Sequence, residues 1–123
     1  MTKRVLLVED NKRTVDVLSQ ELTLLGYHVL AATSGEEAIS KASDECPDLI
    51  IMDIRMPKMD GLEAVARIRN DPKTRSIPII AATGNALPGD REKCLDSGCD
   101  DYLAKPFTHR ELRAAIEKLL VTR

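Results

Sequence analysis

Aromatic residues are scarce in this chain of 123 residues, which has no tryptophan and only three aromatic side chains, Tyr27, Tyr102 and Phe107. The hydrophobic share is nevertheless 43%, as in an ordinary globular protein, so the core must be built mainly from aliphatic side chains. A chain of this length forms one domain and can bury a core of useful size. We therefore expect a single aliphatic-cored domain over residues 1–123.

Neither sign of charge is in large excess, and long apolar runs are missing. The net charge is −2, which argues against a nucleic-acid-binding surface. No apolar run approaches the length of a membrane span, so we expect a cytoplasmic protein that does not enter the membrane. Cys46, Cys94 and Cys99 are odd in number and lack the paired short spacings of a zinc site, so we expect reduced thiols.

Short apolar segments alternate with amphipathic ones along the whole chain. Strands are expected over residues 4–8, 28–32, 49–53, 77–82 and 101–104. Helices are expected after the capping residues Asn11, Ser34, Asp60 and Thr108, with a weaker one over residues 90–98. Five strands alternating with five helices predict right-handed crossovers and an α/β fold, a parallel sheet with helices on both faces.

The third expected strand, residues 49–53, is apolar until it ends on a carboxylate, Asp53. A continuous apolar run indicates a strand buried on both faces, and Pro57 followed by Asp60 and Gly61 then turns the chain. Open α/β sheets place their chemistry at the carboxyl ends of the strands. Asp53 therefore occupies a position where a functional side chain is expected.

Other polar residues also follow the strands directly: Glu9 and Asp10 the first, Thr83 the fourth and Lys105 the fifth. With the first, third, fourth and fifth strands adjacent, all of these side chains gather at one edge of the sheet. Two carboxylates about 4 Å apart repel by roughly 4 kcal/mol at an effective dielectric constant near 20. A hard divalent cation, best Mg²⁺, would sustain such a cluster.

Lys105 supplies one positive charge against three carboxylates, which leaves the site at about −2 and near neutral with Mg²⁺ bound. That balance can accept a phosphoryl group on one carboxylate. Negative charge developing on the transferred group would meet the cation, the Lys105 ammonium and the Thr83 hydroxyl.

Four sequence motifs together resemble the receiver domain of two-component response regulators: Glu9-Asp10, residues 53–61, Thr83-Gly84 and residues 102–106. The resemblance covers the whole chain. It implies a flavodoxin-like five-stranded parallel sheet of order 2-1-3-4-5. It also implies a phosphorylation-controlled switch in a phosphorelay rather than a metabolic enzyme, with slow self-phosphotransfer and autodephosphorylation.

The same resemblance assigns roles around Asp53, which would accept a phosphoryl group from a histidine kinase or a histidine phosphotransfer protein. Asp10, Asp53 and the backbone carbonyl of Arg55 would hold Mg²⁺, with Glu9 helping directly or through water. Glu9 stands where the family more often has aspartate. Arg55 and Asn85 occupy positions that tune the lifetime of the phosphorylated state in the family.

The resemblance further implies how the signal leaves the site. Lys105 would pair with the phosphoryl group, Thr83 would move to bond it, and Tyr102 would follow inward. The bond between Lys105 and Pro106 would be cis. The face formed by residues 90–98, 101–104 and the last helix would then change its downstream effector, and the chain would be a monomer or a weak, phosphorylation-dependent dimer.

Two other functions suit parts of the pattern. Aspartate, threonine and lysine would equally serve a Mg²⁺-dependent aspartyl-phosphate phosphatase, but Ile54 and Arg55 follow Asp53, so an Asp-x-Asp nucleophile motif is missing. A flavin carrier can share the fold, but the acids Glu9 and Asp10 would repel the cofactor phosphate, and few aromatic rings are available for stacking.

Overall fold

The computed structural model describes residues 2–56, 58–84 and 87–121. Pro57 and Asn85, for which roles are expected, lie outside these ranges. Strands and helices alternate in the order β1 (Arg4–Val8), α1 (Lys12–Leu24), β2 (His28–Ala32), α2 (Gly35–Glu45), β3 (Leu49–Asp53), α3 (Gly61–Asn70), β4 (Ile79–Thr83), α4 (Asp90–Asp96), β5 (Asp101–Ala104) and α5 (His109–Val121).

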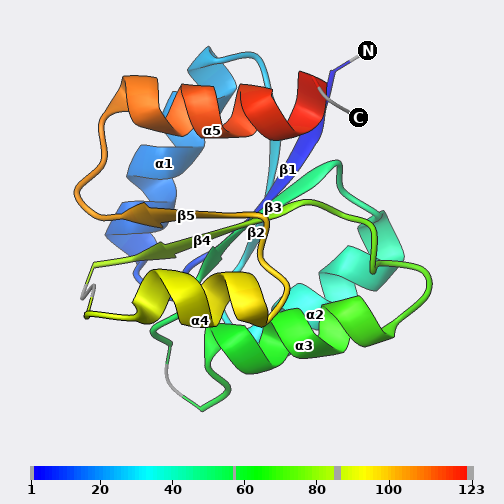
Figure 1. Cartoon of the computed structure of the whole chain (residues 1–123). Helices are drawn as coiled ribbons and strands as arrows, with labels where there is room; N and C mark the ends of the chain where they lie inside the picture. Colours follow the sequence, from blue (N-terminus) through cyan, green and yellow to red (C-terminus); the bar gives the residue numbers. More distant parts are fainter. Residues whose placement is uncertain (1, 57, 85–86, 122–123) are drawn as a thin grey trace.

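The five strands form one parallel sheet of order β2-β1-β3-β4-β5, which confirms the expected fold class. In Figure 1, α1 and α5 cover one face of the sheet and α2, α3 and α4 cover the other. Parallel neighbours need crossover connections, and the helices supply them. The carboxyl ends of all five strands therefore point to one edge.

The aliphatic core lies in two layers because successive side chains of a strand point to opposite faces. In β3, Ile50 and Met52 belong to the cluster under α2, α3 and α4, whereas Leu49 and Ile51 belong to the cluster under α1 and α5. Every residue of β3 and of β4 is buried. β3 is the central strand of the sheet, and Asp53 is its last residue.

Side chains cap the helices where the sequence predicts. Thr108 and Glu111 form a reciprocal capping box, each side chain accepting a hydrogen bond from the other residue's backbone N–H, at 3.0 and 2.9 Å. Ser34 also accepts from the N–H of Glu37, at 3.1 Å. The Glu37 carboxylate, however, accepts from Thr33 instead of Ser34, so the box at α2 is displaced by one residue.

The fourth strand begins two residues later than expected, at Ile79 rather than residue 77. Pro78 carries no N–H and cannot donate to the ladder, although its carbonyl still accepts from Ile50 at 2.9 Å. The N–H of Ile77 turns back to the carbonyl of Thr74, at 3.1 Å. The apolar pattern predicted too early a start for the strand, because an apolar segment that leads into a strand has the same residue pattern as the strand itself.

The weakly predicted fourth helix is present as α4, which has seven residues and no side-chain cap. Gly89 starts it with φ at 87°, a conformation that glycine adopts without strain. Among the described helices, none combines the length and the apolar character that a membrane crossing needs.

Candidate functional site

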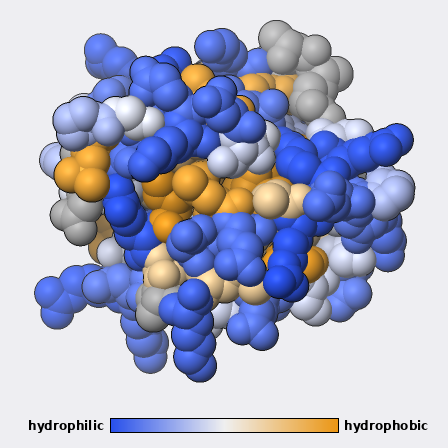
Figure 2. Space-filling model, turned by 60° about the horizontal axis from the view of Figure 1, so that its bottom comes forward, coloured by the Kyte–Doolittle hydropathy of each residue, from blue (hydrophilic) through white to orange (hydrophobic). Residues whose placement is uncertain are grey.

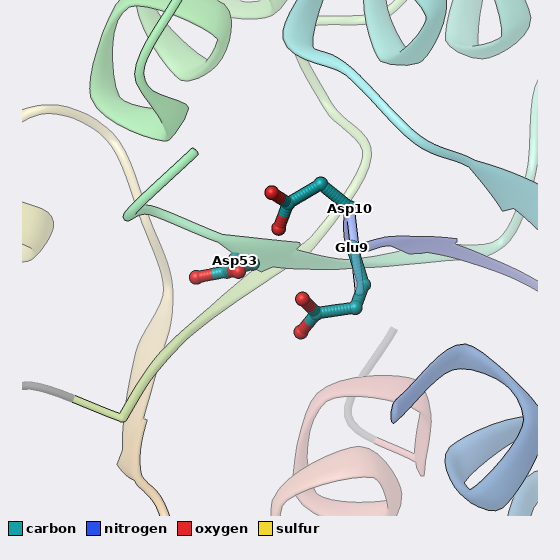
Figure 3. Close-up of side chains that lie close together, drawn as sticks. All are labelled: Glu9, Asp10 and Asp53. Atoms are coloured by element: carbon teal, nitrogen blue, oxygen red, sulfur yellow. The ribbon is translucent and has the colours of Figure 1, made fainter. Parts of the chain in front are cut away.

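The parallel register brings the polar strand ends together, as the sequence predicts. Val8 pairs with Met52, and Asp53 pairs with Ala82. Glu9 and Asp10, directly after β1, therefore lie beside the end of β3. Figure 3 shows the side chains of Glu9, Asp10 and Asp53 together beyond the ends of these two strands.

These three acids each offer a carboxylate oxygen within 4.8 Å of the others. Glu9 is 4% exposed and Asp53 7% exposed, whereas Asp10 is exposed. Burial strengthens the repulsion among their charges because less water screens it. An arrangement of this kind is unfavourable for stability and favourable for binding a cation.

Glu9 is held by contacts on both of its carboxylate oxygens. The Lys105 ammonium donates to Oε1 at 2.6 Å, and the backbone N–H of Asn11 donates to Oε2 at 3.1 Å. Burial by itself raises the pKa of Glu9, but the contact with Lys105 and the Asn11 N–H together outweigh it, so the pKa lies below its ordinary value. Glu9 is therefore ionised and already has two hydrogen-bond donors.

The pKa of Asp53 is shifted in the opposite direction, above its ordinary value. Burial raises the pKa of Asp53 to about 6, although the N–H of Arg55 donates to its Oδ1 at 3.0 Å and lowers it. The neighbouring Glu9 charge raises this pKa further, and the Lys105 charge lowers it. The pKa values of these two adjacent carboxyl groups therefore differ. Glu9 is ionised at neutral pH, whereas Asp53 has a pKa of about 6 and titrates just below neutral pH.

Thr83 and Lys105 complete the edge on the β4 and β5 side. Thr83 is fully buried at the end of β4, and its carbonyl accepts from the N–H of Lys105 at 2.8 Å. Among the described residues, a β-carbon on Gly84 would have one neighbour within 4.0 Å, the Lys105 Cδ, so these residues leave space beside Thr83 and Gly84. The bond between Lys105 and Pro106 is cis, as expected.

Tyr102 lies on β5, and its ring packs against the core cluster on the α2, α3 and α4 side of the sheet. Its hydroxyl is buried and has no hydrogen-bond partner among the described residues. Burial raises the pKa of this hydroxyl, and the nearby Asp90 charge adds to the effect. The ring thus occupies the inward arrangement of the two that an amphipathic side chain can take.

Two contacts of this edge were missed by sequence reasoning. The guanidinium of Arg55 donates to Oδ2 of Asp90 at 2.8 Å, which joins the loop after β3 to the start of α4. A single acid at a helix start gives no signal of such a pair, because 35 residues separate the two partners. The partner of Lys105 was missed for the same reason.

The donor set of the site suits a hard divalent cation. Glu9, Asp10 and Asp53 each offer a carboxylate oxygen, which is the kind of ligand that Mg²⁺ prefers. No cysteine or histidine belongs to this cluster, so the chemistry of a soft or borderline metal is not favoured. The residues present therefore fit Mg²⁺.

Proteins of one family share this sequence over most of its length. The family model described as "Response regulator receiver domain" matches residues 5–117. The chain is 38% identical over 120 residues to the alkaline phosphatase synthesis transcriptional regulatory protein PhoP of Bacillus subtilis, a match covering 98% of this chain and 49% of PhoP. It is 39% identical over 108 residues to the polar-differentiation response regulator DivK of Brucella abortus, covering 88% of each. The chain thus spans about half the length of PhoP and most of DivK.

Solved structures agree with this likeness. The receiver domain of the sensor histidine kinase PA1611 from Pseudomonas aeruginosa superposes with a TM-score of 0.91 at 42% identity, covering 98% of this chain and 99% of that one. That structure has a magnesium ion coordinated in its active site cleft. The chemotaxis protein CheY4 of Vibrio cholerae gives a TM-score of 0.90 at 31% identity, with coverage of 98% and 100%.

Proposed function

Since this chain belongs to the response regulator receiver domain family of two-component signalling, we propose that Asp53 is the residue on which it accepts a phosphoryl group. The family consists of signalling switches rather than metabolic enzymes. The observation that carries the proposal is the position of Asp53: it ends the buried central strand, between the acids after β1 and the Thr83 and Lys105 pair. No other carboxylate of the cluster is both buried and without a lysine partner.

The proposed reaction is a direct transfer to the carboxylate. An oxygen of Asp53 forms a bond to phosphorus while the bond from phosphorus to the imidazole nitrogen of the donor breaks. The bonding electrons return to that nitrogen, which leaves an acyl phosphate on Asp53 and a neutral donor histidine after proton uptake. The carboxylate must be ionised to attack, and a pKa of about 6 leaves most Asp53 side chains ionised at neutral pH.

Neighbouring residues have distinct parts in the proposal. Asp10, Asp53 and the backbone carbonyl of Arg55 would hold Mg²⁺, and Glu9, whose oxygens already accept two hydrogen bonds, would act through water. When bound, Mg²⁺ would neutralise the charge that develops on the phosphoryl oxygens. Lys105 would leave Glu9 to pair with one of these oxygens.

The signal would leave through Thr83. Its hydroxyl can donate to a phosphoryl oxygen, and Tyr102 is the aromatic residue on the adjacent strand. The face formed by α4, β5 and α5 would then change its affinity for a downstream effector. We also propose a histidine kinase or histidine phosphotransfer protein as the donor, slow autodephosphorylation, action in the cytoplasm, and a monomer or weak phosphorylation-dependent dimer.

The test is chemical labelling with a small donor. Incubation with acetyl phosphate and Mg²⁺ should add one phosphoryl mass to the wild-type chain and none to Asp53→Asn, as measured by intact mass spectrometry. Asp48→Asn is a matched control, because Asp48 is an aspartate just before β3, at the end of the strand opposite to Asp53. Labelling of Asp53→Asn at the wild-type level would refute the assignment.

Metal binding can be tested on stability, independently of phosphorylation. Mg²⁺ should raise the melting temperature of the wild-type protein, because it binds only the folded chain. Asp10→Asn should lose most of that increase, whereas Asp16→Asn, on the exposed side of α1, should keep it. An equal increase in Asp10→Asn and the wild type would exclude Asp10 as a ligand.

A further inference from the structure

Arg55 makes contacts in two directions. Its backbone N–H donates to Oδ1 of Asp53 at 3.0 Å, and its guanidinium donates to Oδ2 of Asp90 at 2.8 Å. One residue therefore touches both the proposed phosphoacceptor and the first residue of α4. No side chain in between is needed to connect the two.

Asp90 is unusually well held for an acid at a helix start. It is 5% exposed, and the same Oδ2 that receives the guanidinium also accepts from the N–H of Leu87 at 2.8 Å. The N–H of Asp90 donates back to the carbonyl of Leu87 at 3.0 Å. The carboxylate thus fixes the turn that precedes α4 as well as the arginine.

The ion pair spans an open region of the surface. A cleft of about 490 Å³ lies between the loop after β3 and α4, and Arg55 and Asp90 are among its lining residues, with Ile54 and Leu62. Figure 2 shows the side of the molecule on which α3 and α4 lie, where apolar side chains surface inside a rim of hydrophilic ones. A cleft beside α4 leaves space into which that helix can move, so the ion pair across the cleft restrains the position of the helix.

We propose that the Arg55–Asp90 ion pair couples the phosphorylation site to α4, with Asp90 acting as a positioning residue for the backbone of Arg55. This inference rests on the proposed function, because the backbone carbonyl of Arg55 is one of the ligands expected to hold Mg²⁺ there. Fixing the side chain of Arg55 restricts its backbone, so a cation bound there gains from the pair. By reciprocity, binding at the site holds the first turn of α4 in place.

This coupling acts in parallel with the signal that passes through Thr83 and Tyr102, and it requires different residues. It needs an arginine two residues after Asp53 and an acid at the first position of α4. Tyr102 senses the same acid, since the Asp90 charge acts on its hydroxyl.

A double-mutant cycle on Mg²⁺ affinity tests the coupling. The dissociation constant of Mg²⁺ is measured by amide chemical-shift titration, at fixed ionic strength, for the wild type, Arg55→Gln, Asp90→Asn and the double variant. Each single variant should weaken binding by about threefold to tenfold, and the double variant should be no weaker than either single one. Melting temperatures check that each variant is folded.

A simple charge effect makes different predictions. Removing a cation should tighten Mg²⁺ binding and removing an anion should weaken it, so Coulomb forces alone would make Arg55→Gln bind more tightly and let the two changes cancel. Lys93→Gln is the matched control, since Lys93 is another cation that lines the cleft. Tighter binding by Arg55→Gln, to the same extent as by Lys93→Gln, would overturn the proposal.

The amides of α4 provide a second measure. Mg²⁺ should shift the amide signals of residues 87–94 in the wild type, and these shifts should shrink in Arg55→Gln and Asp90→Asn. Full shifts in both variants would overturn the coupling. Labelling by acetyl phosphate separates this failure from that of the proposed function: a phosphorylated Asp53 with unchanged Mg²⁺ affinities refutes the coupling alone, whereas labelling of Asp53→Asn refutes the function itself.

Discussion

The Lys105 ammonium lies 2.6 Å from Oε1 of Glu9, so the cation of the site is held by a carboxylate other than the proposed phosphoacceptor. Glu9 is 5% exposed at its side chain and Lys105 24%, so water screens this contact only in part. This relationship makes the titration of Asp53 dependent on Glu9.

Glu9→Gln should lower the pKa of Asp53 below its value of about 6. The substitution removes a neighbouring negative charge and frees Lys105 to act on Asp53, and both changes favour the ionised carboxyl. Carboxyl carbon shifts followed by NMR against pH, in EDTA, would measure the midpoint. Glu117→Gln, an exposed acid on α5, is the control and should leave it in place. A midpoint for Asp53 that rises in Glu9→Gln would contradict this expectation.

The stability of the metal-free protein should depend on pH through Asp53. An exposed aspartate has a pKa of 3.8, whereas Asp53 in the folded protein has a pKa of about 6, so its ionisation disfavours folding. This destabilisation is absent below pH 3.8, grows as the pH rises, and is complete above pH 6. Asp53→Asn should then be more stable than the wild type by about 3 kcal/mol at pH 7.5, and by about 1 kcal/mol at pH 4.5.

Denaturant unfolding in EDTA at the two pH values measures that difference. The comparison between variants cancels the titration of groups that do not interact with Asp53. The contribution of Glu9, whose pKa is lowered, does not cancel completely, because the two carboxyl groups affect each other's pKa. Asp48→Asn serves again as the control. A stability gain of Asp53→Asn that is larger at pH 4.5 than at pH 7.5 would have the wrong sign.

Gly61 is required by the close approach of α3 to the end of β3. A β-carbon on this residue would lie 2.5 Å from Cα of Ile54 and 2.6 Å from the carbonyl oxygen of Asp53. Both are backbone atoms that cannot swing aside, so Gly61→Ala should destabilise the fold by about 2–4 kcal/mol. Gly84→Ala is the matched control, since within the described ranges its β-carbon would meet one atom, Lys105 Cδ at 4.0 Å. Similar melting temperatures for the two variants would contradict this interpretation.

Thr83→Ala should still accept a phosphoryl group on Asp53 but transmit little of the change. The variant keeps the acceptor carboxylate and loses the hydroxyl that would bond a phosphoryl oxygen. In amide NMR spectra, phosphorylation of the wild type should shift signals from about Gly84 to Lys105 and into α5. In Thr83→Ala the distal shifts should collapse, whereas Thr83→Ser should retain them. Undiminished shifts at Tyr102 in Thr83→Ala would mean that the signal takes another path.

Much of the fold could be predicted because its signals are local. Apolar runs ending in polar residues indicate the five strands, and capping residues such as Ser34 and Thr108 indicate the helix starts. The gathering of Glu9, Asp10 and Asp53 could be predicted once the first and third strands were taken to be parallel neighbours, the order that the family resemblance implied. The predicted start of β4 was wrong, because Ile77 is apolar and yet lies in a turn before Pro78.

The contacts within the site could not be predicted, because they depend on side-chain reach across the sheet edge. Lys105 pairs with Glu9 over 96 residues, and Arg55 pairs with Asp90 over 35. Each partner is an ordinary surface charge in sequence. Which carboxylate a lysine selects depends on distances of a few ångströms, which a pattern of residue types does not encode.

The hydroxyl of Tyr102 is buried and has no hydrogen-bond partner among the residues that the structure describes, which makes this part of the core locally frustrated. A phenylalanine would fill the same space without stripping water from a polar group, a loss of about 1–3 kcal/mol. The hydroxyl therefore raises the energy of the inward ring relative to an outward one whose oxygen is hydrated. Tyrosine at this position reduces the free-energy difference between the two ring orientations. A modest free-energy change at the phosphorylation site is then enough to alter which orientation is more populated.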